Sequence, residues 1–198
     1  MENQNKVRAD LRQLKPFFIV AFVGIIYHLR IRPMAGDDVF FSQATSELGL
    51  WNYLIQRYET WTSRFVIEFL LVWIIKYPIL WRLIDLALFI SFPVLISKIF
   101  DGGKLLDWCA AAAVLLYPFH DMGTAGWITT TVNYFWPVWG MFFVGFLLKK
   151  MLVHKKINIV EGIAGVLVCV IASSHEQVAV IPVSYTHLRA HETEADLV

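Results

Sequence analysis

The sequence has few charged residues, little net charge and almost no cysteine. Charged residues make up 17% of the 198 positions, whereas about 25% is usual for a soluble protein. The formal net charge is only +1, so we expect no nucleic-acid partner, because such binding depends on clustered positive charge. The two cysteines, Cys109 and Cys169, lie in apolar runs. Their spacing fits neither a disulfide framework nor a metal site, and we expect both to be buried apolar residues.

Apolar residues take the place of the missing charges. They make up 58% of the chain, and 8 Trp, 7 Tyr and 15 Phe crowd the edges of long runs that contain no charged residue. A helix needs roughly 20 mainly apolar residues to cross a lipid bilayer. The composition therefore predicts an all-α fold, a polytopic transmembrane helical bundle in the cell membrane with the lipid bilayer around it.

Six apolar stretches are candidate membrane helices, at residues 14–29, 65–77, 79–97, 105–119, 134–148 and 157–173. Positive residues concentrate in short cytoplasmic loops, and here they cluster before the first stretch and between the last two. Both clusters are cytoplasmic only if one stretch does not cross. We expect residues 65–77 to lie along the outer interface, because this stretch is short and contains Glu68. The prediction is a multi-pass protein with five spans, one interfacial helix and a cytoplasmic N-terminus; six spans is the alternative.

Residues 183–198, VSYTHLRAHETEADLV, differ abruptly in composition from the apolar chain before them. This string resembles the translation of a transposase adapter used in sequencing libraries, so we treat it as a non-native tail. We therefore expect one helical membrane domain over residues 1–182 that is the N-terminal part of a longer protein. The histidines and carboxylates of the tail then carry no information about a metal site.

Two adjacent carboxylates, Asp37 and Asp38, follow the first apolar stretch in the segment GDDVFF. At a membrane surface such a pair suits a divalent cation, or one carboxylate acts as a general base toward an acceptor hydroxyl. The alternative is a solvated pair that caps a helix, because Asp is favoured at N-cap positions. The sequence leaves both interpretations open.

An aromatic segment follows the aspartate pair. Apolar residues from Leu48 to Tyr58 recur at helical spacing, which predicts an amphipathic helix lying on the bilayer. Its aromatic rings suit either stacking on sugars or anchoring at the membrane interface. Arg64 comes next, and it either binds a phosphate through its planar guanidinium or pairs with Glu68, four residues later.

Two further polar clusters fall on the outer side in this topology. Residues 120–137 are rich in hydroxyl, amide and aromatic side chains, among them Asn133, and suit either polyol recognition or a re-entrant turn. His175 and Glu176 follow the last stretch and suit either substrate contact or a simple helix end. Because three separate clusters face the same side, the sequence predicts a site built from loops on a helical scaffold.

One ionisable residue, Asp85, lies deeper within a predicted span than the others. Such groups are costly in a membrane and are usually paired. We expect Arg82, three residues earlier on the same helix, to be its partner.

The order of these segments resembles that of GT-C type bacterial glycosyltransferases. The resemblance is carried by the first span, the aspartate pair in GDDVFF and the segment TSRF. The later segments TTTVNYFWP and SSHEQ are similar to those of an uncharacterised family of bacterial membrane proteins often grouped with these enzymes. GT-C enzymes are polytopic proteins that take a sugar from a polyprenyl-phosphate carrier on the extracytoplasmic face. The resemblance covers about residues 15–180.

The resemblance implies a role for each polar cluster. Asp37 or Asp38 would be the catalytic carboxylate, and Arg64 would bind the phosphate of the polyprenyl-phosphate sugar donor. The substrate-side residues would be Asn133, His175 and Glu176. The implied reaction serves a cell-surface polysaccharide or glycolipid, and a divalent cation is the one cofactor that the aspartate pair would suit. A transporter or flippase for a lipid-linked saccharide and a non-catalytic membrane subunit are the competing hypotheses.

Overall fold

A computed structural model describes the backbone of residues 2–117 and 126–180, and the side chains of these ranges from Leu14 onward. Every element in these ranges is helical, which confirms the predicted all-α class. The elements are α1 (Glu2–Arg30), α2 (Asp37–Gln43), α3 (Gly49–Thr60), α4 (Phe65–Ile74), α5 (Pro78–Phe100), α6 (Lys104–Leu115), α7 (Ile128–Thr130), the π-helix η1 (Thr131–Phe135), α8 (Trp136–Leu152) and α9 (Ile159–Ser173). The predicted adapter tail and residues 120–125 of the second polar cluster lie outside the described residues.

Local sequence signals set several helix ends. Pro78 occupies the first turn of α5, where a missing N–H is tolerated, and Asp101 ends the helix in the left-handed conformation with a φ of 46°. A capping box starts α9: the Asn158 side chain accepts from the Glu161 amide at 2.8 Å, and the Glu161 carboxylate accepts from the Asn158 amide at 3.1 Å. These signals fix where α5 ends and where α9 begins.

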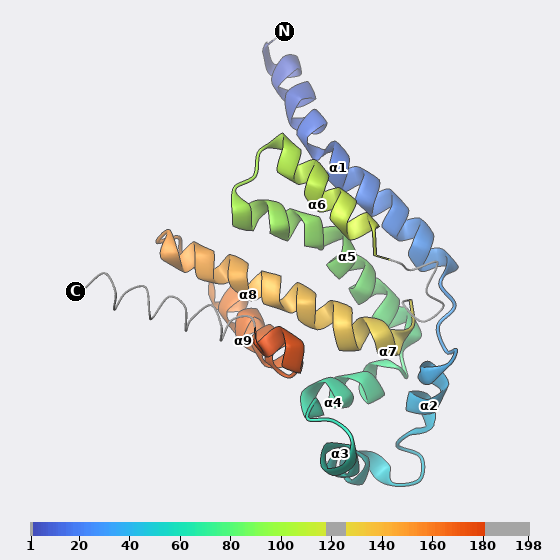
Figure 1. The fold of residues 1–198 in the computed structure, drawn as a ribbon. Helices are drawn as coiled ribbons and strands as arrows, with labels where there is room; N and C mark the ends of the chain where they lie inside the picture. The colour runs from blue at the N-terminus through green and yellow to red at the C-terminus, as the bar shows by residue number, and fades with distance from the viewer. Residues whose placement is uncertain (1, 118–125, 181–198) are drawn as a thin grey trace, which may run out of the picture.

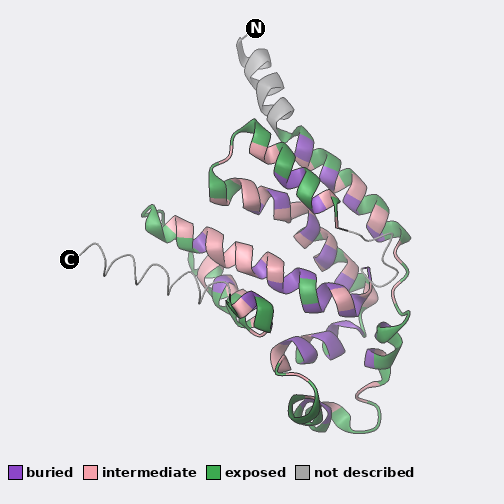
Figure 2. Cartoon of the chain, in the orientation of Figure 1, coloured by how far each residue is buried: buried purple, intermediate pink, exposed green. Residues whose placement is uncertain are grey.

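The longer helices α1, α5, α6, α8 and α9 form a bundle, and the short helices α2, α3, α4 and α7 gather at one end of it (Figure 1). In the bundle α8 packs against both α5 and α9, while α1 packs against α5 and α6. Buried residues follow the inner faces of α4, α5 and the start of α8 (Figure 2). The core therefore supports the end of the bundle that carries the short helices.

Among the described residues, two helical segments are long and apolar enough to cross a membrane: α5, with 23 residues, and the continuous segment Ile128–Leu152, with 25 residues. At 1.5 Å per residue both exceed the apolar thickness of about 30 Å. The ten residues of α4 rise only about 15 Å, so α4 is too short to cross alone. Its inner residues Ile67 and Leu71 are fully buried, while Phe69 and Trp73 remain exposed. The stretch predicted to lie at the interface is thus a short helix packed into the core along one face.

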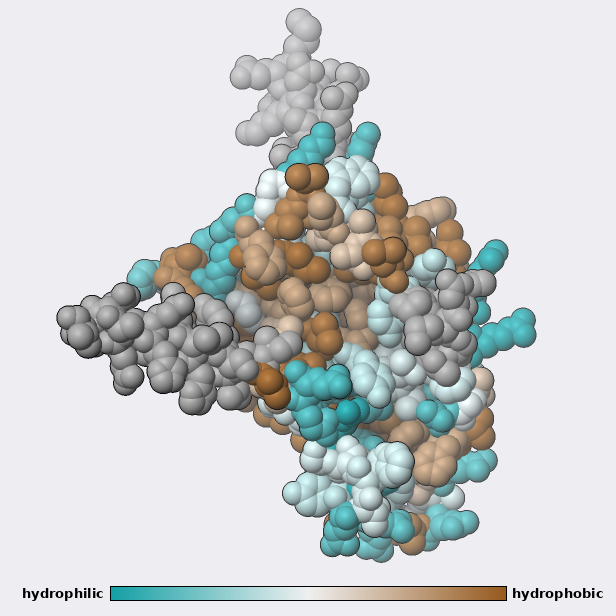
Figure 3. Space-filling model, in the orientation of Figure 1, coloured by the Kyte–Doolittle hydropathy of each residue, from teal (hydrophilic) through white to brown (hydrophobic). Residues whose placement is uncertain are grey.

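Large apolar side chains cover much of the outer surface. The exposed faces of α1 and α9 carry them along most of each helix, including Phe18, Phe22, Ile163 and Leu167. Figure 3 shows apolar residues gathered across the middle of the molecule and hydrophilic ones at the α3 end. Contiguous surfaces of this kind are unusual in soluble monomers and indicate contact with lipid or protein. Cys109 and Cys169 are also exposed, so the prediction that both are buried was wrong.

A buried polar cluster centred on Asp85 joins three helices of the bundle. The fully buried Asp85 carboxylate on α5 accepts a hydrogen bond from Trp136 Nε1 on α8 at 2.6 Å, and it lies 2.9 Å from His28 Nε2 on α1. The predicted partner Arg82 instead donates to the backbone carbonyl of Ile31 at 3.0 Å. The pairing predicted from the i−3 spacing was therefore wrong, because Asp85 points into the bundle while Arg82 reaches along its edge to the end of α1.

The Asp85 cluster makes a prediction about stability. In double-mutant cycles, Asp85→Ala with His28→Ala should give a coupling energy of about 1–3 kcal/mol, since the two side chains are in contact and buried. Asp85→Ala with Arg82→Ala should give less than about 0.5 kcal/mol, the value for independent sites. Thermal and denaturant unfolding in detergent supplies both numbers. Equal coupling in the two cycles would contradict the assignment of His28 as the partner.

Candidate functional site

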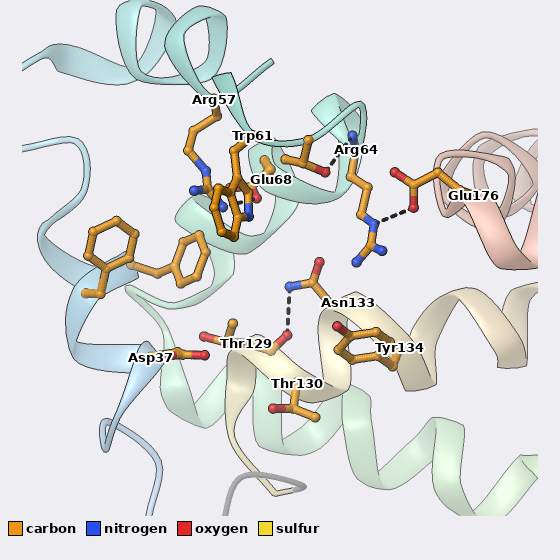
Figure 4. Close-up of a pocket in the computed structure, with 13 residues that line it drawn as sticks. Asp37, Arg57, Trp61, Arg64, Glu68, Thr129, Thr130, Asn133, Tyr134 and Glu176 are labelled. Carbon is orange, nitrogen blue, oxygen red and sulfur yellow. Dashed lines mark hydrogen bonds and ion pairs between the residues drawn. The ribbon is translucent and has the colours of Figure 1, made fainter. Parts of the chain in front are cut away.

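An open cavity of about 610 Å³ lies at the end of the bundle formed by the short helices (Figure 4). Helix α2 forms one wall, the end of α3 and the turn before α4 form the roof, and α7 with η1 forms the floor. Its lining residues are Asp37, Phe40, Phe41, Arg57, Trp61, Thr62, Arg64, Glu68, Thr129, Thr130, Asn133, Tyr134 and Glu176. The lining combines three carboxylates, two guanidinium groups and four aromatic side chains, which is a surface suited to a polar ligand with flat apolar faces.

The two adjacent aspartates have different environments. Asp38 is fully buried, and its carboxylate accepts from the Ile128 amide at 3.1 Å, from the Thr129 amide at 2.8 Å and from Thr129 Oγ1 at 2.7 Å. It also accepts from the Met34 amide at 3.0 Å. Asp37, one helical step away, is exposed and points into the cavity (Figure 4). Asp38 therefore holds α2 onto α7, and Asp37 is the carboxylate of the pair that a ligand can reach.

Gly36 makes the turn before these aspartates possible. Its φ is 53°, in the region that favours glycine, and a Cβ atom there would overlap the ring of Trp127. The ring of Trp127 can thus pack directly against the backbone that leads into α2. This close contact fixes where α2 begins and hence the direction of Asp37.

Arg57 on α3 is held by a buried carboxylate on α4. Its Nη2 donates to Glu68 Oε1 at 2.9 Å, and Tyr53 Oη donates to Glu68 Oε2 at 3.1 Å. Burial, reinforced by the charge of Glu68, raises the pKa of Tyr53, so the phenol remains a neutral donor. The guanidinium of Arg57 also lies over the rings of Phe41 and Trp61, at 5.5 and 5.7 Å. These contacts fix a positive charge in the roof of the cavity.

Arg64 pairs with Glu176, which lies more than a hundred positions later in the chain. Its Nε donates to Glu176 Oε2 at 2.7 Å, and Ser63 Oγ donates to Glu176 Oε1 at 2.7 Å. The interpretation that Arg64 pairs with Glu68 was wrong, because Glu68 turns inward to Arg57. The terminal nitrogens of Arg64 point down toward Asn133 and Tyr134 (Figure 4).

The hydrogen bonds of the Arg64–Glu176 ion pair shift the pKa of both side chains. Burial alone would raise the pKa of Glu176, but the hydrogen bonds from Ser63 and Arg64 outweigh it and lower this pKa to about 2. Burial likewise opposes the charge of Arg64, but hydrogen bonds with Glu176 and Tyr134 raise its pKa overall. Both side chains are therefore charged throughout the physiological range.

The floor of the cavity is a π-helical turn. Asn133 in η1 donates from Nδ2 to the Thr129 carbonyl at 2.9 Å, which leaves its amide oxygen directed at the cavity (Figure 4). Tyr134 is half exposed, and its ring lies under the Arg64 guanidinium at 5.6 Å. π-Helical turns within a longer helix are frequent at functional sites because they change the direction of the side chains that follow. Here the π-helical turn η1 brings the neighbouring side chains of Asn133 and Tyr134 to one surface.

His175 lies behind this floor and does not line the cavity. It is 2% exposed, and its ring makes an edge contact with Tyr134 at a centroid distance of 5.5 Å. Neither ring nitrogen has a hydrogen-bond partner in the described part of the chain. Burial, and then the charge of Arg64, lower the pKa of His175, so the ring is neutral near pH 7.

The cavity brings together four of the six site residues proposed from the sequence. They are Asp37, Arg64, Asn133 and Glu176. Asp38 and His175 support the walls from behind. Sequence reasoning missed Arg57, because Arg64 was the one cation considered for Glu68; a carboxylate in an apolar stretch was the signal that a cation had to lie nearby. In the described ranges no three His, Cys, Asp or Glu side chains are grouped to hold a metal ion, and a divalent cation stays a prediction.

Substituting each aspartate separately tests their different roles. Asp38→Ala should lower the free energy of unfolding by at least about 2 kcal/mol, because it leaves buried amides without an acceptor. Asp37→Ala should change it by less than about 0.5 kcal/mol, as is usual at an exposed site. Thermal unfolding in detergent provides the comparison. Equal effects from the two substitutions would show that Asp38 does not anchor α7.

The low pKa of Glu176 predicts how the ion pair depends on pH. Since this pKa falls from 4.5 to about 2 on folding, the pair contributes fully above about pH 4.5 and its contribution is lost as the pH falls through about 2. The difference in unfolding midpoint between wild type and Glu176→Gln should therefore be constant near neutral pH and shrink in strong acid. Glu59→Gln, which removes an exposed carboxylate outside the cavity, is the control. A difference that begins to shrink near neutral pH would rule out a pKa of about 2.

No protein-family model matches the chain, and no curated protein or solved structure matches it either. The geometry of the cavity therefore carries the functional argument.

Proposed function

We propose that this protein is a multi-pass membrane glycosyltransferase that transfers a sugar from a polyprenyl-phosphate-linked donor on the extracytoplasmic face. The observation that carries the proposal is the exposed carboxylate of Asp37, which shares one aromatic-lined cavity with the guanidinium of Arg64. A base and a phosphate-binding cation on one surface are the two groups that such a transfer requires.

The distribution of lysines supports the proposed orientation. Lys149 and Lys150 lie at the end of α8 that is farthest from the cavity, about 24 Å along the helix axis from Asn133. Positive residues favour the cytoplasmic side. The cavity would then open at the outer surface, where α5 and the segment Ile128–Leu152 supply two of the spans. The predicted topology assigns its other three spans to α1, α6 and α9, although α6 with 12 residues and α9 with 15 rise only about 18 and 23 Å, less than the apolar thickness of about 30 Å.

Arg64 is suited to the phosphate of the donor. Its Nε is occupied by Glu176, while its terminal nitrogens point into the cavity, where a phosphate can accept two hydrogen bonds from the planar group. Because Glu176 bonds to Nε, it holds the guanidinium in place and leaves the terminal nitrogens to the phosphate. Arg57 adds a second fixed positive charge nearby. Together they would stabilise the phosphate as it leaves the sugar.

Asp37 is suited to act as the general base. In the proposed step it takes the proton of the acceptor hydroxyl, the hydroxyl oxygen attacks the anomeric carbon, and the bond from that carbon to the phosphate oxygen breaks. The result is inversion at the anomeric carbon without a covalent enzyme intermediate, so no nucleophilic Ser or Cys is needed. Trp61 and Tyr134 offer faces for stacking on the sugar, and Asn133 offers an amide oxygen. Asp38 and His175 would act by positioning α7 and Tyr134.

A transporter or flippase for a lipid-linked saccharide is less well supported. A transporter needs polar residues that line a route through the bilayer. Asp85 on α5 and His28 on α1 are bonded to each other within the bundle and are 0% and 1% exposed. They hold helices together, which is a structural role rather than a route for a solute.

Replacing the proposed base is the direct test. Asp37→Asn should lower kcat by about 10²- to 10⁴-fold, the usual contribution of a general base, while the unfolding midpoint stays unchanged. The assay uses the purified chain in detergent with radiolabelled sugars on polyprenyl phosphate, and Glu59→Gln is the matched control. Arg64→Gln should chiefly raise KM for the donor. Wild-type transfer rates in the Asp37→Asn variant, or no transfer by the wild type from any of the donors, would refute the proposal.

A further inference from the structure

A second cavity, of about 360 Å³, lies at the opposite end of the bundle from the candidate site. Three chain segments form it: the end of α5 with the turn after it, the last turns of α8, and the turn between α8 and α9. Its lining residues are Lys98, Asp101, Phe146, Lys149, Lys150, Val153 and Lys155. Four of these seven residues are lysines, although α5 and the α8–α9 turn are far apart in the sequence. We call this the lysine cavity.

Two of the lysines are held in place by carboxylates. Lys149 Nζ donates to the Lys98 carbonyl at 2.8 Å and lies 2.6 Å from Asp101 Oδ2. Lys150 Nζ donates to both oxygens of Glu161, each at 2.7 Å. The side chains of Lys149 and Lys150 are only 24% and 17% exposed, so their stems are packed against the protein. Their ammonium groups are therefore positioned before any ligand arrives.

The other two lysines leave positive charge in excess. No carboxylate in the described part of the chain lies within ion-pair distance of Lys98 or Lys155. The Lys98 ammonium lies instead over the ring of Phe146 at 5.8 Å, and Lys150 lies over the same ring at 5.9 Å. Lysines gathered around one cavity repel one another, and a bound anion removes this repulsion. The cavity thus has the electrostatics of a phosphate site.

The surroundings of the cavity indicate the source of the phosphate. The end of α8 and the residue after it expose large apolar side chains beside the cavity: Met151 is 59%, Leu152 is 67% and Val153 is 49% exposed. A free phosphate or a sugar phosphate makes no favourable contact with such an apolar surface. The acyl chains of a lipid can pack against it. The cavity also lies at the ends of α5 and of the segment Ile128–Leu152, which are both long enough to cross a bilayer. The ends of such helices lie at the level of the lipid headgroups.

We propose that the lysine cavity binds the phosphate headgroup of an anionic phospholipid, with Lys98 and Lys155 as the cations that meet it and Lys149 and Lys150 as the fixed wall. The site is separate from the cavity of Asp37 and Arg64 and has no part in sugar transfer. It depends on the insertion of the bundle in a membrane, and not on the proposed enzymatic activity. Binding there would fasten the ends of α5, α8 and α9 to the lipid leaflet on this side.

The experiment is a titration of the full chain in neutral detergent with short-chain phosphatidylglycerol, followed by native mass spectrometry. Phosphatidylcholine of the same chain length and glycerol 3-phosphate are titrated in parallel. Phosphatidylglycerol should bind at least about tenfold more tightly than either compound, because each lysine near a lipid surface contributes appreciably and the acyl chains add apolar contact. The double variant Lys98→Gln with Lys155→Gln should lose about 10- to 30-fold in affinity. Lys76→Gln, an exposed lysine outside this cavity, should bind as the wild type does.

Each of the opposite results overturns the proposal. Unchanged affinity in the double variant would place the lipid elsewhere, and equal binding of phosphatidylcholine would show that charge is not recognised. Equal binding of glycerol 3-phosphate would assign the cavity to a soluble phosphate. Both substituted lysines are exposed and carry no ion pair among the described residues, so the double variant should keep the wild-type unfolding midpoint. Loss of sugar transfer has no bearing on this result, which keeps the two proposals separable.

Discussion

The buried carboxylate of Asp38 is the interaction on which the candidate site depends. The first amides of a helix have no partner within the helix, and here the segment Ile128–Leu152 begins inside the protein, where water cannot satisfy them. Asp38 accepts from two of these amides, and its negative charge also suits the positive end of the helix dipole. A carboxylate from a segment ninety positions earlier thus serves as the cap. Because it does so, α2 lies against α7, and Asp37 reaches the same cavity as Asn133.

The rest of the cavity follows from paired charges of the same kind. Glu68 brings Arg57 into the roof, and Glu176 brings Arg64 over Tyr134. The first pair joins the consecutive helices α3 and α4, the second joins segments more than a hundred positions apart, and each leaves a guanidinium facing the cavity. The two ends of the bundle consequently differ: one combines carboxylates, guanidinium groups and aromatic rings, and the other gathers lysines around Phe146. The helical scaffold separates these two ends by the length of α8, and the orientation that we propose rests on this separation.

Several expectations drawn from single stretches of sequence were wrong for a common reason. The Arg82–Asp85 and Arg64–Glu68 pairs rested on helical spacing, which places two side chains on one face but does not say which way that face points. In the structure Asp85 and Glu68 both turn inward to partners on other helices, His28 and Arg57. The cysteines were expected to be buried because they are apolar. In a bundle whose outer surface is itself apolar, however, hydropathy does not distinguish the inside from the outside.

The sequence by itself determined the helical class, the apolar stretches and the polar clusters that supply the site, because these depend on local composition and periodicity. From a topology inferred from the lysines it also predicted one site for six residues, and the structure brings four of them into one cavity, namely Asp37, Arg64, Asn133 and Glu176. Only the tertiary structure decided which aspartate faces the cavity and which one caps a helix. Neighbouring residues on a helix point about 100° apart, and their roles depend on what packs against each direction. That information lies in contacts between distant segments, which no local pattern contains.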